Sequence, residues 1–153
     1  MKLPPITKTY GSRGVLDLPA LELEDGVIHA VIGANGSGKS TLARILAGVL
    51  VPDGGAVPRT GRVGYMPQRS YPFRMSVLRN LRLTGAGRDR AMAQLEAFGL
   101  AGLARQNAKG LSGGEAARLA LARLLMEEYS LLILDEPTAA MDVAATLLAE
   151  ELL

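Results

Sequence analysis

The stretch Gly33-Ala-Asn-Gly-Ser-Gly-Lys39-Ser40 decides the fold, because two glycines five positions apart followed by Lys and Ser form the pattern of a phosphate-binding loop. Glycines let the backbone curl until successive N–H groups point at one anion. A helix that starts at the loop adds the positive end of its dipole. In this pattern Lys39 reaches the β- and γ-phosphates, and the Ser40 hydroxyl binds Mg²⁺. The stretch therefore predicts a nucleoside triphosphate site.

The segments around the loop alternate between strand and helix patterns. Residues 26–32 are mostly apolar and rich in β-branched side chains, so they predict a buried strand with His29 packed near the core. Residues 39–50 place apolar side chains at helical spacing, up to Val49. Further strands are expected at 62–66 and 131–134, and further helices at 76–83, 89–98, 112–126 and 144–153. This alternation predicts an α/β fold with a mainly parallel sheet.

The apolar strand 131–134 ends in two acids, Asp135 and Glu136. In a parallel sheet the end of such a strand lies beside the phosphate loop, so Asp135 is placed to hold magnesium. Glu136 is placed to polarise an attacking water as a general base. Apolar strands often end in acids, so this motif indicates a nucleotide site only in combination with the phosphate loop upstream.

The segment Leu111-Ser-Gly-Gly-Glu115 offers backbone N–H groups and a hydroxyl at the start of a helix. Ser112 and Glu115 also have the spacing of a capping box. One nucleotide site does not need two phosphate-binding surfaces, and the simplest resolution is that the second one binds the nucleotide held by another copy. The alternative is an ordinary Ser-capped helix, and the residues alone leave both open.

Composition narrows the function classes. The chain has 153 residues, of which 48% are hydrophobic and 21% charged, as in a globular protein with a core. It has no cysteine, which excludes disulfides and thiolate metal sites. We expect no secretory signal and no membrane span, because no apolar run approaches about 20 residues. Basic residues concentrate in 54–110, which suggests a solvated face or a nucleic acid, acidic lipid or protein partner.

Five motifs in order resemble the ATP-binding cassette (ABC) nucleotide-binding domain. Residues 33–41 are similar to the family's P-loop, and Tyr-Met-Pro-Gln68 resembles its Q-loop. Residues 111–115 are similar to its signature motif, and residues 131–136 to its Walker B strand with the catalytic glutamate. Pro-Thr-Ala-Ala-Met-Asp142 resembles its D-loop. The resemblance extends from near Tyr10 to the last residue.

The resemblance implies a P-loop NTPase fold with a small N-terminal antiparallel β portion and a helical subdomain. It assigns 1–68 and 127–153 to the ATP-binding core and 69–126 to the helical subdomain. It implies ATP and Mg²⁺ as cofactors, with Glu136 and Gln68 catalytic. Ser40, Gln68 and Asp135 would hold the metal. The nucleotide-binding residues that it implies are Tyr10, which would stack on adenine, together with Gly33, Asn35, Gly36, Ser37, Gly38, Lys39, Ser40, Thr41, Ser112, Gly113, Gly114 and Asp142.

The resemblance also implies partners. Two cassettes would pair head to tail, and a transmembrane permease subunit would dock on the basic middle segment, which favours a protein over nucleic acid there. The chain would then lie on the cytoplasmic face of the membrane. The alternatives are a soluble ABC ATPase acting on ribosomes or DNA, and a nucleotide-binding module without turnover.

Two positions depart from the family pattern. Glu115 stands where Gln is commoner, which should be tolerated. The family's switch histidine lies beyond the D-loop on a further strand, and His29, the only histidine, precedes the loop. That strand inserts between the P-loop strand and the Walker B strand, so we expect the sequence to belong to a protein of roughly 200 residues.

Overall fold

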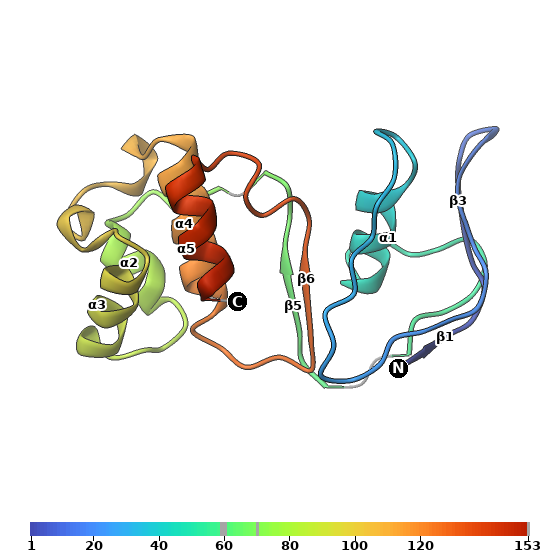
Figure 1. Ribbon diagram of the computed structural model, residues 1–153, viewed down its shortest axis with the longest axis horizontal. Helices are drawn as coiled ribbons and strands as arrows, with labels where there is room; N and C mark the ends of the chain where they lie inside the picture. Colours follow the sequence, from blue (N-terminus) through green and yellow to red (C-terminus); the bar gives the residue numbers. More distant parts are fainter. Residues whose placement is uncertain (59–60, 70, 153) are drawn as a thin grey trace. The chain divides into compact units, whose positions relative to one another are not determined.

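The structure, a computed structural model, describes residues 1–58, 61–69 and 71–152 (Figure 1). The chain divides into two compact units. The first, here called the phosphate-loop unit, consists of residues 1–65 and 130–135. The second, the helical unit, consists of residues 66–129 and the residues from Glu136 onward.

The phosphate-loop unit begins with short antiparallel strands. β1 (Lys2–Leu3) pairs with β4 (Leu21–Glu22), and β2 (Ile6–Tyr10) pairs with β3 (Arg13–Leu18), with a register shift between Lys8 and Thr9. Helix α1 (Lys39–Leu46) packs on β3 and on β6 (Leu131–Leu134). Strand β5 (Val63–Met66) pairs with β6. The predicted antiparallel portion is therefore confirmed, and so is the strand before Asp135.

The core of the phosphate-loop unit is small. Leu3, Ile6 and Ile45 are each no more than 2% exposed and form one cluster. Partly buried side chains pack around this cluster, among them Leu16 and Leu18 of β3 and Leu46 of α1. The cluster fixes α1 against the strands, and α1 carries the loop residues Lys39 and Ser40 at its first turn.

Residues 26–32 do not form the predicted buried strand. No strand is assigned there, and Val27, Ile28, Val31 and Ile32 are between 54% and 91% exposed. A strand needs a neighbour to accept its backbone hydrogen bonds, and none of the described residues pairs with this segment. The prediction for His29 is also wrong, because its ring is exposed and its Nε2 accepts from the Glu24 N–H at 3.0 Å.

The other sequence predictions need two corrections. Helix α1 ends at Leu46 and not near residue 50, because Gly48 takes a left-handed φ of 72° and Val49 is left 60% exposed. The predicted continuous sheet is not formed by the described residues, whose strands make three separate two-stranded sheets, with antiparallel pairing in β1–β4 and β2–β3. An α/β composition thus holds without one continuous sheet.

The helical unit contains α2 (Val77–Arg82), α3 (Arg88–Ala97), α4 (Gly113–Leu124) and α5 (Val143–Glu151), with 3-10 turns at Ala101–Leu103 and Ala108–Gly110. Helix α4 packs against α2, α3 and α5, as Figure 1 shows for α4 and α5. The core side chains are at most 1% exposed: Val77, Leu81, Leu95, Phe98, Leu100, Leu119 and Leu121. The first and last residues of these helices lie within one or two residues of the predicted ones, except that residue 153 of the last predicted helix lies outside the described residues.

Across residues 1–58, 61–69 and 71–152, no helix has both the length and the apolar character that crossing a bilayer requires.

Candidate nucleotide-binding site

The phosphate loop takes its shape from glycines in the positions where no other residue fits. Gly38 has φ 96°, in the left-handed region, and its α-carbon packs so closely on β3 that a Cβ would lie 2.5 Å from the Val15 carbonyl oxygen. A Cβ on Gly33 would lie 2.7 Å from Ser37 Oγ. Backbone curvature of this kind makes a cradle for an anion, and side chains would fill it.

One cationic side chain and the start of α1 face this cradle. The Lys39 ammonium donates to the carbonyl oxygens of Gly33 and Ala34, at 2.8 and 3.1 Å, so it lies over the loop. The N-cap of α1 is Gly38, which has no side chain to cap the first turn. The first-turn N–H groups therefore keep their donor capacity toward the loop, where the helix dipole is positive. The donor set fits a polyphosphate.

The second motif lies beside the first within the phosphate-loop unit. Ser40 Oγ donates to Asp135 Oδ1 at 3.1 Å, and Asp135 is only 8% exposed. Burial, together with the Asp135 carboxylate nearby, raises the pKa of Tyr65 above its usual range. A hydroxyl and a carboxylate oxygen are the hard ligands that Mg²⁺ prefers, and this ion usually takes one or two protein ligands plus substrate phosphates.

The helical unit brings Gln68 and Glu136 together. Gln68 Nε2 donates to Glu136 Oε2 at 2.6 Å, and both side chains are exposed. Glu136 has φ 52°, the only positive φ among the described residues that are not glycine. A residue held in this region costs about 1–3 kcal/mol and is often found where a side chain must be aimed. The backbone thus sets the direction in which the Glu136 side chain leaves the chain, and the hydrogen bond from Gln68 orients its carboxylate.

Ser112 begins α4 with the predicted capping box. The Glu115 N–H donates to Ser112 Oγ at 3.3 Å, and the Ser112 N–H donates to Glu115 Oε2 at 2.8 Å. This second bond holds the pKa of Glu115 below its usual value. The box satisfies two of the donors at the helix start, so it sets how residues 112–114 present their backbone.

The glycines of the signature segment pack against residues of the D-loop segment. A Cβ on Gly114 would lie 3.0 Å from the Ala140 carbonyl oxygen, and one on Gly113 would lie 3.8 Å from Ala140 Cβ. Asp142 then caps α5, since its Oδ1 accepts from the Ala145 N–H at 2.8 Å. Within the helical unit, two motifs separated by more than twenty residues thus lie side by side.

The remaining predicted residues occupy exposed positions of the phosphate-loop unit. Tyr10 ends β2 with 48% of its surface exposed, and Lys8 Nζ lies 5.8 Å from its ring centroid. Asn35, Gly36 and Ser37 form the exposed tip of the loop, and Thr41 is half-buried in the first turn of α1. The Ser37 N–H donates to the Ala34 carbonyl at 3.2 Å, which closes the tip.

One organising residue escaped the sequence analysis. Asn80 is fully buried, accepts from the Phe73 N–H at 2.9 Å and donates to the carbonyls of Phe73, Met75 and Ser76. Arg123 of α4 donates to Asn80 Oδ1 at 3.5 Å and stacks 5.0 Å from the Phe73 ring centroid. A polar residue on the buried face of α2, between Val77 and Leu81, was the available signal.

These geometries define the class: a P-loop nucleotide-binding protein with a carboxylate, Asp135, directly after strand β6. The finer assignment comes from comparison with known proteins. The family model "ABC transporter" matches residues 16–139. The chain therefore belongs to the ABC transporter ATP-binding family, and membership implies ATP as the nucleotide.

Relatives and solved structures agree with this family. The chain is 43% identical over 150 residues to the zinc import ATP-binding protein ZnuC of Pseudomonas fluorescens (strain Pf0-1), a match that covers 94% of the chain. The chain spans only 58% of the length of that relative. A structure described as an RNase-L Inhibitor matches 99% of the chain with a TM-score of 0.86 at 29% identity, over 30% of its own length. An inward-facing metal-chelate type ABC transporter matches 99% with a TM-score of 0.77 at 31% identity, over 66% of its own length.

Proposed function

We propose that this chain is the ATP-binding and hydrolysing part of an ABC transporter. The observation that carries the proposal is the pair of phosphate-binding surfaces in one chain. One is the loop 33–40 with Lys39, and the other is the glycine-bearing start of α4 at Ser112. A single nucleotide needs only the first surface, so the second is available to a nucleotide bound by another cassette.

The phosphate-loop unit would bind ATP. The loop amides and Lys39 would hold the phosphates, and Tyr10 would stack on the adenine. Ser40 and Asp135 would hold Mg²⁺, with Gln68 as a further ligand. When bound, Mg²⁺ supplies positive charge that neutralises the developing charge on the transferred phosphoryl group.

Glu136 would act as the general base. Its carboxylate follows Asp135 directly in the sequence and is oriented by its left-handed backbone. The hydrogen bond from Gln68 keeps one carboxylate oxygen occupied and leaves the other to accept a proton from water. Gln68 would thus position the base and report whether the site is filled.

Two cassettes would pair head to tail, so that Ser112, Gly113 and Gly114 of one close over the phosphates held by the other. Asp142 would couple the two sites. It caps α5, and the residue two positions before it, Ala140, packs on Gly114 of the signature segment. A transmembrane permease subunit would bind the assembled pair at the cytoplasmic face of the membrane. The 43% identity to a zinc import protein makes zinc the first substrate to test.

A second candidate is a soluble ABC ATPase. The structural match to an archaeal ribosome recycling factor, with a TM-score of 0.84 at 30% identity, supports it. A third is a nucleotide-binding module without turnover. An ATPase assay of the full-length protein, with and without its membrane subunit, separates the three. A transporter ATPase is stimulated by the subunit, a soluble ATPase is not, and a module shows no turnover in either case.

The role of Glu136 is tested with Glu136→Gln. We expect ATP binding to persist while turnover falls by about 10²- to 10⁴-fold, and an ATP-bound dimer to accumulate in size-exclusion chromatography. Glu128→Gln, at an exposed glutamate of the helical unit, is the matched control and should turn over ATP normally. Normal turnover in Glu136→Gln would remove Glu136 from the mechanism.

A further inference from the structure

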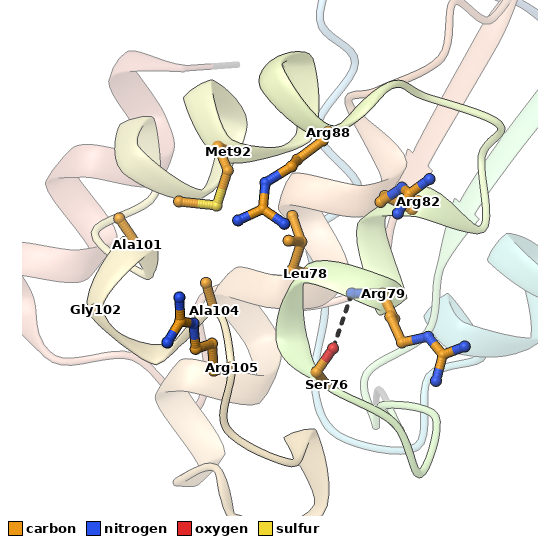
Figure 2. A pocket seen from close by; sticks show the side chains of 10 residues that line it. All are labelled: Ser76, Leu78, Arg79, Arg82, Arg88, Met92, Ala101, Gly102, Ala104 and Arg105. Carbon is orange, nitrogen blue, oxygen red and sulfur yellow. Dashed lines mark hydrogen bonds between the residues drawn. The ribbon is translucent and has the colours of Figure 1, made fainter.

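The helical unit has a hollow lined by arginines (Figure 2). Its volume is about 640 Å³, within the range of small-molecule pockets. Four arginines contribute to its lining: Arg79 and Arg82 on α2, Arg88 at the start of α3, and Arg105 after the 3-10 turn Ala101–Leu103. Figure 2 shows Arg88 extending over the hollow toward Leu78, with Arg105 on another side of it.

The positive charge of this hollow is not neutralised by the residues that line it. No acidic residue lines it, and none of the four guanidinium groups takes part in an ion pair or a side-chain hydrogen bond with the described residues. All four arginines are exposed. In contrast, Arg90 and Arg123 of the same unit donate to Met126 and Asn80. The lining arginines are therefore available to a partner from outside the chain.

The hollow is not purely ionic. Leu78, Met92, Ala101 and Ala104 supply apolar surface between the arginines. Met is flexible and fits apolar side chains of varied shape, whereas a small inorganic anion gains nothing from such a surface. An apolar area bordered by guanidinium groups is complementary to a polypeptide that carries an apolar side chain flanked by carboxylates, each of which an arginine can bind through two N–H groups.

We infer that this hollow is the docking point for an acidic polypeptide segment of a partner protein, with an apolar side chain over Leu78 and Met92 and carboxylates on Arg88 and Arg105. The proposed function leaves the chemistry of the partner's contact open, and this inference supplies it. The identity of the partner as the transporter's membrane subunit rests on the proposed function. Binding of the segment itself requires neither ATP nor turnover.

The test is fluorescence anisotropy of the folded chain with a short fluorescein-labelled peptide in which glutamates flank one leucine. We expect saturable binding that weakens as NaCl is raised. A peptide with glutamine for every glutamate, and another with alanine for the leucine, should each bind at least about fivefold more weakly. The double variant Arg88→Gln/Arg105→Gln should weaken binding of the glutamate peptide by about fivefold or more.

Arg13→Gln is the matched control, because it removes the same charge from an exposed position on β3 in the other unit. It should leave peptide binding unchanged. Circular dichroism and binding of a fluorescent ATP analogue, measured on the same samples, establish that each variant is folded and separate this inference from the proposed ATP site. Equal binding of the glutamate and glutamine peptides would overturn the proposal. So would displacement of the peptide by equimolar inorganic pyrophosphate, which would make the hollow a small-anion site.

Discussion

The two units differ in how much of their apolar surface they bury. The helical unit has a core to which all four of its helices contribute, with side chains such as Leu95 and Leu121 wholly excluded from solvent. The phosphate-loop unit centres on Leu3, Ile6 and Ile45 and leaves Ile28 and Ile32 about nine-tenths exposed. Even so, the loop beside Ile32 has its anion-binding curvature. The shape of the phosphate loop is therefore a local property, set by Gly38 against β3, and does not require residues 26–32 to be paired.

The largest expected effect concerns stability. Leu95→Ala empties a fully buried site in the helical unit and should lower the free energy of unfolding by about 2–5 kcal/mol. Ile32→Ala, at a site 91% exposed, should change it by less than about 0.5 kcal/mol. Urea unfolding followed by circular dichroism gives both values. A large loss in Ile32→Ala would mean that residues 26–32 are packed in solution, and would remove the contrast between the units.

The next effect concerns ATP affinity. Lys39→Ala removes the ammonium group over the loop and should weaken ATP binding by about 10- to 100-fold, the loss expected for a hydrogen bond from a charged donor. Lys109→Ala makes the same change at an exposed position of the helical unit and should leave the affinity of the isolated chain unchanged. Isothermal titration calorimetry compares the two. Equal losses would show that nucleotide contacts are spread over both units.

A smaller effect tests the cap of α4. Ser112→Ala removes the hydroxyl that accepts from the Glu115 N–H and should destabilise the helical unit by about 1 kcal/mol. Amide hydrogen exchange along α4 should increase, because Ser112 caps that helix. Exchange in α1 should stay the same, because its N-cap is Gly38 and Ser112 makes no contribution to it. Ser12→Ala, in the exposed turn between β2 and β3, serves as the control. Unchanged exchange in α4 would count against the capping box.

The smallest effect is a difference in acid response. The hydrogen bond from the Ser112 N–H lowers the pKa of Glu115 in the folded state. The contribution of Glu115 to the free energy of unfolding is therefore complete above 4.5, its pKa in the unfolded chain, and is lost as the pH falls through its folded-state pKa. In the phosphate-loop unit, hydrogen bonds from Lys8 and Thr9 lower the pKa of Asp53 from 3.8 to about 2. On acidification, NMR should report loss of the Glu115 cap only below pH 4.5, and loss of the Asp53 contacts only near pH 2. Loss of the cap above pH 4.5, or loss of the Asp53 contacts already at pH 3.8, would contradict these assignments.

The sequence predicted well where a local pattern decides the conformation. The capping box at Ser112, the strand Leu131–Leu134 and the ends of α2 and α3 follow from neighbouring residues, and the structure has each of them. The family assignment is confirmed, and so is the α/β composition. The Ser40–Asp135 hydrogen bond joins residues 95 positions apart, as expected from a strand end beside the loop.

The failures arise where pairing decides the outcome. Residues 26–32 have the composition of a buried strand, but composition cannot supply the neighbours that a strand needs. The early end of α1 was readable from Gly48, whose left-handed backbone outweighs the apolar spacing of Val49. Asn80 was missed because its role depends on the loop 73–76 and on Arg123, which the sequence does not place beside it.

The contact between Gly114 and Ala140 also limits how the chain can vary. Any side chain at position 114 would bring a Cβ to 3.0 Å from the Ala140 carbonyl oxygen, so the backbone at 140–141 would have to shift by a few tenths of an ångström. Met141 and Asp142 follow at once, and Asp142 starts α5. The signature and D-loop segments are therefore expected to change together over evolution, and a library that randomises both at once should recover functional pairs that single substitutions miss.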